Sequence, residues 1–170
     1  MSASSIPTAK RGGYALVIGF SGGLLKFGNR EEHFEAGTYV YSGSALGGIK
    51  RRVERHVRMF YRIGRKRHWH IDALLERCEQ FATICAQSNI RTECRLVFIL
   101  VSAYGMKPVS GFGSTDCRSG CKGHLLRSNV DFEGTVLAVM NAFRQMGLEP
   151  SECGRWDRIL KHPMHHPRSA

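Results

Sequence analysis

No stretch of this sequence approaches the ~20 consecutive apolar residues that a membrane-spanning helix needs. Near the N-terminus, Lys10 and Arg11 are followed by no uninterrupted apolar core with a cleavage site, so we expect no secretory signal peptide. No internal repeat is visible, and six cysteines in 170 residues do not resemble a disulfide-stapled secreted domain. These absences predict a cytoplasmic protein with no membrane partner, whose cysteines are free thiols or metal ligands.

Acidic residues are scarce compared with basic ones. Twenty-five Lys and Arg stand against fourteen Asp and Glu, which gives a formal net charge of +11. Residues 130–170 hold as many acidic as basic groups, so the first 129 positions carry the whole excess. Such a concentration is typical of proteins that bind a phosphate backbone. The alternative is a solvated basic surface without a partner, which we favour less because charges that serve only solubility usually alternate in sign.

Apolar content is sufficient for one folded domain. Hydrophobic residues make up 42% of the chain and include nine phenylalanines, which argues against disorder. The patterning predicts strands and helices separated by a Gly-, Ser- and Cys-rich loop over 105–124. The strands are expected over 14–20, 38–42 and 81–86, and the helices from 49 to the Gly64 break and over 69–78, 91–101 and 130–146. This order predicts an α+β fold, with a small mixed or antiparallel sheet flanked by helices and an extra C-terminal helix.

The most informative stretch is residues 37–72. A β-prone run reaches a Ser/Gly turn, and a helix follows whose apolar residues Ile49, Val53 and Phe60 recur at helical spacing. Between positions 49 and 68, nine Lys and Arg stand against one acid, Glu54. We therefore expect this segment to bind nucleic acid through Lys50, Arg51, Arg55, Arg58, Arg65, Lys66 and Arg67.

Several motifs in order resemble one known family. Gly13-Tyr14 opens the first strand, Tyr41-Ser42-Gly43 ends the second, and Arg52-x-x-Arg55-His56 lies on the basic helix. With the strings GTYVYSGSALGG, HWHIDALL, and FGSTDC followed by GHL, they resemble the GIY-YIG nuclease superfamily, in particular its Uri-type endonuclease branch. The first signature lacks the central isoleucine, and the second carries serine in place of an aliphatic residue.

The resemblance implies a site and a domain plan. Residues 13–127 would form the GIY-YIG-like nuclease domain, preceded by a flexible N-terminus over 1–12. A C-terminal helical extension over 128–160 and a flexible tail over 161–170 would follow it. One Mg²⁺ or Mn²⁺ would be held by Glu93, at the head of the helix after the third strand. The catalytic residues would be Tyr14, Tyr41, Arg52, His56 and His68.

These residue types suit phosphodiester hydrolysis. An arginine fork neutralises charge that develops on phosphate oxygens, and Mg²⁺ prefers a carboxylate plus several waters. A tyrosine acts as a general base only where cations lower its pKa from about 10, and Arg52 with a metal would supply them. Taken alone, Tyr14 and Tyr41 could be ordinary strand aromatics, and Glu93 could simply face the helix dipole.

A second constellation lies in the loop over 105–124. Cys117, Cys121 and His124 follow C-x3-C-x2-H spacing, and three such ligands within eight residues suit Zn²⁺, with His70, Cys94 or Asp116 as the fourth. We favour a glycine-rich loop that closes over the active site without zinc, because the spacing is looser than that of a paired C-x2-C knuckle.

The sequence therefore predicts a metal-dependent endonuclease that acts on nucleic acid, with DNA as the expected substrate. One alternative is a catalytically silent nucleic-acid-binding domain that uses the same basic helix. A second is a zinc-stabilised interaction module whose basic face docks an acidic protein. The altered signatures support the silent domain, whereas the retained Tyr41, Arg52, His56 and Glu93 argue for an enzyme.

Overall fold

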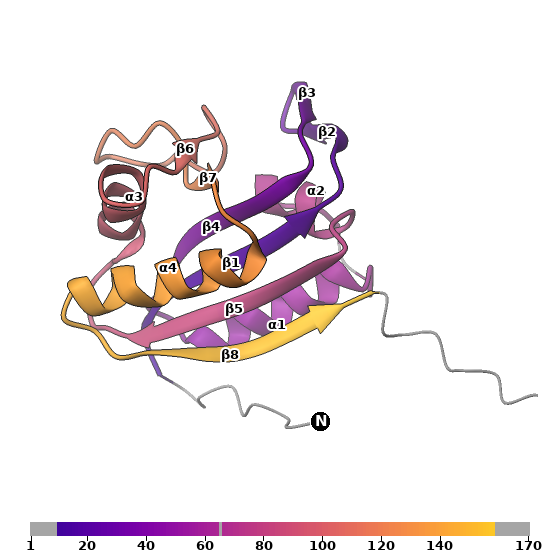
Figure 1. The fold of residues 1–170 in the computed structure, drawn as a ribbon. Coiled ribbons are helices and arrows are strands. Elements are labelled where there is room, and N and C mark those ends of the chain that lie inside the picture. The colour runs from indigo at the N-terminus through magenta and orange to yellow at the C-terminus, as the bar shows by residue number, and fades with distance from the viewer. Residues whose placement is uncertain (1–9, 65, 159–170) are drawn as a thin grey trace, which may run out of the picture.

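A six-stranded antiparallel sheet forms the centre of the protein (Figure 1). The computed structural model describes residues 10–64 and 66–158. The strand order is β6-β7-β4-β1-β5-β8, and every adjacent pair is antiparallel. The strands are β1 (Gly12–Phe20), β4 (Gly37–Ala45), β5 (Gln80–Gln87), β6 (Lys107–Pro108), β7 (Leu125–Arg127) and β8 (Pro150–Asp157). The predicted α+β class is confirmed, with an antiparallel rather than a mixed sheet.

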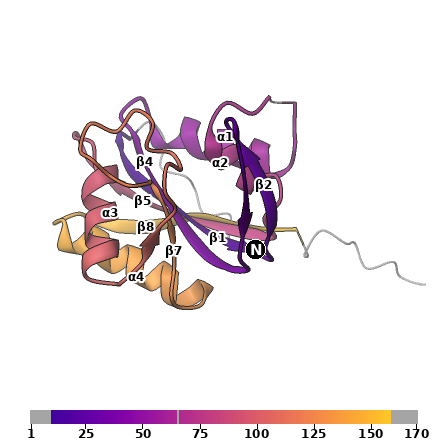
Figure 2. The ribbon, with the colours of Figure 1, turned by 90° about the horizontal axis from the view of Figure 1, so that it is seen from above.

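Helices cover both faces of this sheet, as the view from above shows (Figure 2). Along β1, successive side chains point to opposite faces, so one apolar strand feeds two cores. The helices are α1 (Ile49–Phe60), α2 (His70–Leu75), α3 (Glu93–Ser102) and α4 (Phe132–Gln145). Tyr14, Leu16 and Ile18 pack with α1 and α2, whereas Ala15 and Val17 pack with α3 and α4. Among the described residues, no helix is both long and apolar enough to cross a bilayer.

The basic helix forms where the spacing predicts it. Ile49, Val53 and Phe60 are buried against the sheet, and the opposite face of α1 carries the exposed cations. The helix begins after Gly48, whose φ of 116° lies in the left-handed region that favours glycine. The backbone N–H of Ile49 donates to the carbonyl of Lys10 at 2.9 Å, which ties the helix start to the segment before β1.

A small hairpin stands beyond one end of the sheet and links β1 to β4. It consists of β2 (Gly23–Phe27) and β3 (Arg30–Phe34), which pair with each other as antiparallel strands. Phe27 packs against Phe112 in the glycine-rich loop, with ring centroids 4.8 Å apart. The hairpin thereby reaches the same region as the loop that precedes β7.

The C-terminal part differs from our expectation. We predicted a helical extension over 128–160, but α4 is followed by β8, which pairs with β5 and completes one edge of the main sheet. The sequence of β8, PSECGRWD, contains proline, glycine and charges, and its strand conformation comes from pairing with β5 rather than from local preference. Residues 1–9 and 161–170, which we expected to be flexible, lie outside the described residues, whereas Gly12 already belongs to β1.

Two cysteines also depart from the expectation of free thiols. Cys85 on β5 and Cys153 on β8 are joined by a disulfide, with their Cα atoms 6.1 Å apart. The other four, Cys78, Cys94, Cys117 and Cys121, are free. The disulfide was invisible in the sequence because β8 itself was not predicted.

Candidate active site

The site begins with the register of β1 and β4. This register places Tyr14 opposite Gly43, and the ring of Tyr14 lies over the glycine. A Cβ at position 43 would lie 2.4 Å from Cζ of Tyr14, far inside van der Waals contact. Gly43 is therefore the residue that leaves room for Tyr14.

A buried hydrogen bond connects this tyrosine to α1. The hydroxyl of Tyr14 lies 3.0 Å from Nε2 of His56, and both side chains are almost fully buried. Tyr41 lies on the same face of the sheet, and its ring centroid is 6.4 Å from that of His56. The two strands and the helix therefore bring Tyr14, Tyr41 and His56 together.

Burial controls the protonation of this group. It lowers the pKa of His56 to about 3, with the positive charge of Arg55 acting in the same direction. It also raises the pKa of Tyr41 to about 12 and that of Tyr14 well above its ordinary value, although Arg52 lowers both. We expected nearby cations to lower the pKa of the tyrosines, but without a bound metal the effect of desolvation on the pKa is larger. Tyr14, Tyr41 and His56 are therefore all neutral near pH 7.

The two arginines of α1 have different roles in the structure. Arg55 forms a bidentate pair with Asp72, at 2.7 and 2.6 Å, and the side chain of Asp72 is fully buried. Asp72 also accepts the backbone N–H groups of His68 and Trp69. Burial tends to raise the pKa of Asp72, but the Arg55 pair and these N–H donors lower it below its ordinary value. We infer that Arg55 joins α1 to α2 rather than offering a free charge.

Arg52 is free to meet an anion. Its guanidinium lies 4.5 Å from the ring centroid of Trp69, and that of Arg55 lies 3.9 Å away. Arg52 makes no ion pair with any residue in 10–64 or 66–158, and its charge lowers the pKa of both Tyr14 and Tyr41. Trp69 packs against the core and also holds both arginines by cation–π contact.

Glu93 reaches the same site from α3. Its side chain is 12% exposed, and its charge raises the pKa of both tyrosines, so its carboxylate lies within electrostatic reach of them. The hydroxyl of Ser44 donates to the Glu93 carboxylate and accepts the backbone N–H groups of Thr92, at 2.9 Å, and of Glu93, at 3.3 Å. Ser44 thus satisfies backbone N–H groups at the start of α3. The carboxylate and hydroxyl are hard oxygen donors that suit Mg²⁺ or Mn²⁺.

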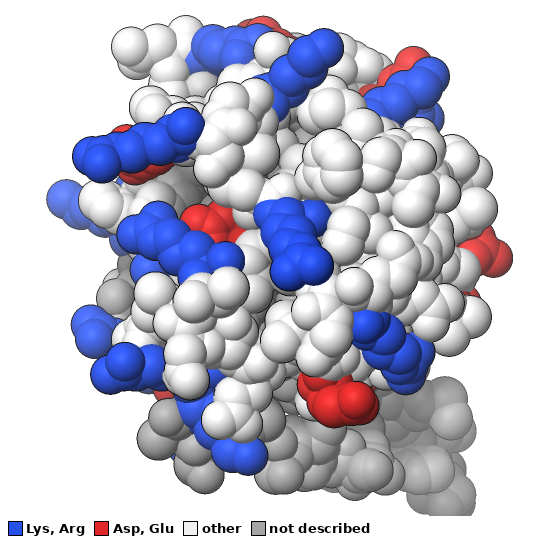
Figure 3. Space-filling model, turned by 90° about the vertical axis from the view of Figure 1, so that its left-hand side faces the viewer, with Lys and Arg blue, Asp and Glu red and all other residues white. Residues whose placement is uncertain are grey.

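The remaining predicted residues lie farther out. His68 is exposed, and its ring contacts Trp69 at a centroid distance of 5.6 Å. The exposed cations of α1 are Lys50, Arg51 and Arg58. Lys66 is exposed, Arg67 pairs with Glu76 at 2.6 Å, and Arg65 lies outside the described residues. Seen from the side of α3, Lys and Arg are spread over the visible face and acidic groups are few (Figure 3).

A second group of side chains gathers where α3 meets the glycine-rich loop. The ligand atoms of Cys94, Cys117, Cys121 and His124 all lie within 4.8 Å of one another. This cluster can hold a metal ion, and its soft donors suit zinc better than magnesium. The metal-free loop that we favoured does not explain the convergence. Cys94 was one of three candidates for the fourth zinc ligand. The sequence could not select it, because only the fold shows that α3 brings Cys94 next to Cys117, Cys121 and His124.

Hydrogen bonds already favour a thiolate in this cluster. Burial raises the pKa of Cys117, but backbone N–H groups of Cys121 and Ser119 outweigh it and lower the value to about 6. Burial and neighbouring sulfurs raise the pKa of Cys94 and Cys121.

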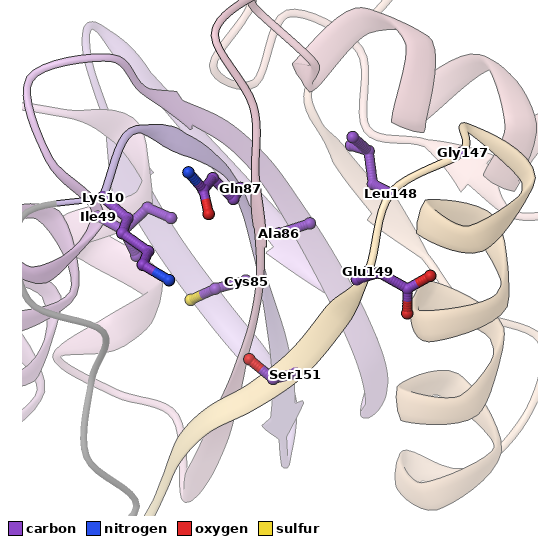
Figure 4. A pocket seen from close by; sticks show the side chains of 9 residues that line it. All are labelled: Lys10, Ile49, Cys85, Ala86, Gln87, Gly147, Leu148, Glu149 and Ser151. Carbon is purple, nitrogen blue, oxygen red and sulfur yellow. The ribbon is translucent and has the colours of Figure 1, made fainter.

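A pocket in the described part of the chain lies away from these side chains. It has a volume of about 450 Å³ and lies between the end of β5 and the turn that joins α4 to β8 (Figure 4). None of its lining residues belongs to the candidate active site or to the cluster of Cys94, Cys117, Cys121 and His124. Its lining consists of Lys10, Ile49, Cys85, Ala86, Gln87, Gly147, Leu148, Glu149 and Ser151.

Comparison with known proteins adds a family but no activity. No curated protein and no solved structure matches the chain. Residues 13–147 match the family described as Domain of unknown function DUF123. The match covers every candidate site residue and extends past the expected boundary at 127 through the end of α4. The chain therefore belongs to the DUF123 family.

Proposed function

We propose that this protein is a metal-dependent endonuclease that hydrolyses phosphodiester bonds in nucleic acid, with DNA as the expected substrate. The main support is that β1, β4 and α1 bring Tyr14, Tyr41, Arg52 and His56 together, with the Glu93 carboxylate at the start of α3 within electrostatic reach of both tyrosines. The resemblance of their motifs to GIY-YIG nucleases supports the same reaction. The proposed setting is the cytoplasm.

Arg52 is the proposed phosphate-binding group. Its guanidinium is oriented by Trp69 and is not neutralised by a carboxylate among the described residues. A fork of N–H donors binds phosphate oxygens in the ground state and in the transition state, where the oxygens gain charge. Arg55 supports this arrangement indirectly, because its pair with Asp72 holds α1 against α2.

The tyrosines would orient the scissile group. Since burial keeps both hydroxyls protonated at neutral pH, Tyr41 is suited to donate a hydrogen bond to a phosphate oxygen. Tyr14 shares its hydrogen bond with the neutral His56, which fixes the hydroxyl in one direction. When bound, Mg²⁺ or Mn²⁺ would supply Lewis-acid stabilisation, with Glu93 as the ligand and Ser44 orienting its carboxylate.

The test is cleavage of labelled single-stranded, duplex and branched nucleic acids in Mg²⁺ or Mn²⁺. Glu93→Gln should abolish cleavage while binding stays equal or tightens, because a negative charge near phosphate is removed. Arg52→Ala should lose cleavage and part of the binding. Glu54→Gln, which removes an exposed carboxylate on α1, is the matched control and should cut as wild type does. Wild-type cleavage with an equally active Glu93→Gln would refute the metal assignment, and tight binding without any cleavage would favour the silent domain.

A further inference from the structure

The cluster of Cys94, Cys117, Cys121 and His124 carries an inference that is independent of nuclease activity. We propose that these four residues bind one structural Zn²⁺ ion, which fastens the glycine-rich loop before β7 to the first turn of α3. Four protein ligands leave no open coordination position, which is the arrangement of structural rather than catalytic zinc.

The distances agree with tetrahedral coordination. Zinc–sulfur bonds of about 2.3 Å and zinc–nitrogen bonds of about 2.0 Å place tetrahedral sulfurs ~3.8 Å apart and sulfur and nitrogen ~3.5 Å apart. The sulfurs of Cys94 and Cys117 are 3.6 Å apart, and the sulfur of Cys94 lies 3.7 Å from Nε2 of His124. These two pairs of donor atoms therefore already have the spacing that the ion requires, and all four ligand atoms lie within 4.8 Å of one another.

The backbone holds two of the ligands in place. His124 is buried, its N–H donates to the carbonyl of Phe112 at 2.8 Å, and its carbonyl accepts the N–H of Ser42 at 3.0 Å. These bonds place His124 at the end of the β4–β7 pairing. Cys94 lies in the first turn of α3, which Ser44 caps. One end of the site is thus built on the sheet and the other on a helix.

Phe112 anchors the earlier part of the loop, but the stretch over 115–120 has little else to fix it. Thr115, Asp116, Arg118, Ser119 and Gly120 are all exposed, so this stretch buries no large apolar side chain. Its backbone contacts are few and include Cys117 N–H to the Ser114 carbonyl at 3.0 Å. A loop without a core is ordered by metal binding because the ligand bonds replace the missing apolar contacts. Cys117 and Cys121 are the side chains of this stretch that turn inward.

Zinc would also act on the neighbouring site. Cys94 directly follows Glu93, and both belong to the turn whose N–H groups Ser44 accepts. Fixing Cys94 therefore fixes the direction of the Glu93 side chain, a consequence that rests on the proposed function. Zinc binding itself does not, because it is measured without any nucleic acid.

The experiment is metal analysis of the full-length protein under reducing conditions. We expect one zinc per chain that resists exchange by weak chelators. Replacement by Co²⁺ should give the intense visible bands and sulfur-to-metal charge transfer of a tetrahedral thiolate site. Cys121→Ser and His124→Ala should weaken affinity by more than the ~10–100-fold that follows loss of a group that merely orients a ligand. Cys78→Ala removes a buried thiol outside the cluster and should keep one zinc.

The proposal can be tested even if a variant folds poorly, because the cobalt spectrum is measured on the wild-type protein. A wild-type protein that takes up no zinc after reduction and reconstitution, or an octahedral cobalt spectrum, would overturn the proposal. Full zinc retention by both Cys121→Ser and His124→Ala would do the same. If zinc binds as expected but no nucleic acid is cut, the zinc site stands and the nuclease proposal fails.

Discussion

Protonation of His56 gives the sharpest physical prediction. A histidine in the unfolded chain has a pKa near 6.5, whereas burial lowers that of the folded His56 to about 3. Between these values the unfolded state binds a proton that the folded state does not, so stability must fall as pH falls below about 6.5. Between pH 7 and pH 5, the free energy of unfolding falls only over the ~1.5 pH units below 6.5. At ~1.4 kcal/mol per pH unit, the total decrease is ~2 kcal/mol.

The groups that face His56 support this magnitude. Tyr14 supplies a neutral hydroxyl, and the charges of Arg55 and Arg52 disfavour an imidazolium, whereas the charge of Asp72 opposes them. Urea unfolding followed by circular dichroism at pH 5 and pH 7 should show the ~2 kcal/mol loss in the wild type and little of it in His56→Gln. Both proteins carry the same cysteine cluster, so any loss of metal in acid cancels in the comparison. Equal pH dependence in the two proteins would refute the buried neutral histidine.

Two further predictions concern packing and charge. Gly43→Ala should lower the melting temperature and impair any cleavage, because its Cβ would lie 2.4 Å from the ring of Tyr14. Gly47→Ala is the matched control, since nothing lies within 4 Å of a Cβ there, and a similar loss in both would contradict the packing argument. If the wild type neutralises about five phosphates, log affinity against log salt should have a slope of about −3.5 to −4.5, from single strands to duplex. Three exposed cations of α1, Lys50, Arg51 and Arg58, can be replaced together by neutral residues. This replacement should make the slope less negative by ~2 to 3. An unchanged slope would exclude α1 as the surface that contacts the phosphates.

Local patterning was sufficient to predict the elements around the proposed active site. The apolar stripe of α1 gave its position, and motif order brought Tyr14, Tyr41 and Arg52 into one hypothesis before any coordinates. The structure places these residues as neighbours because β1 and β4 are adjacent antiparallel strands and α1 follows β4 directly. Elements joined by short connections are usually adjacent in space, so their contacts can be predicted from the sequence.

Features that depend on distant pairing were not predicted. The residues of β8 have little strand preference of their own and form a strand because they pair with β5. Neither β8 nor the Cys85–Cys153 disulfide could therefore be predicted from local sequence. Asp72 looked like one acid in a helical string, and its role as the partner of Arg55 appeared only when α2 packed on α1. The tyrosine pKa was misjudged for a related reason, because sequence shows nearby charge but not the extent of desolvation.

The late position of β8 has a consequence for how the protein is made. The outer edge of β5 stays unpaired until its partner has been synthesised, and 68 positions separate Cys85 from Cys153. At ~5–20 residues per second, that edge waits roughly 3 to 14 s on the ribosome. An open strand edge is a template for pairing with another chain, so the nascent protein passes through a period of exposure to misassembly. Slowed translation within α4 would lengthen that period, and a chain that stops before Pro150 would never leave it.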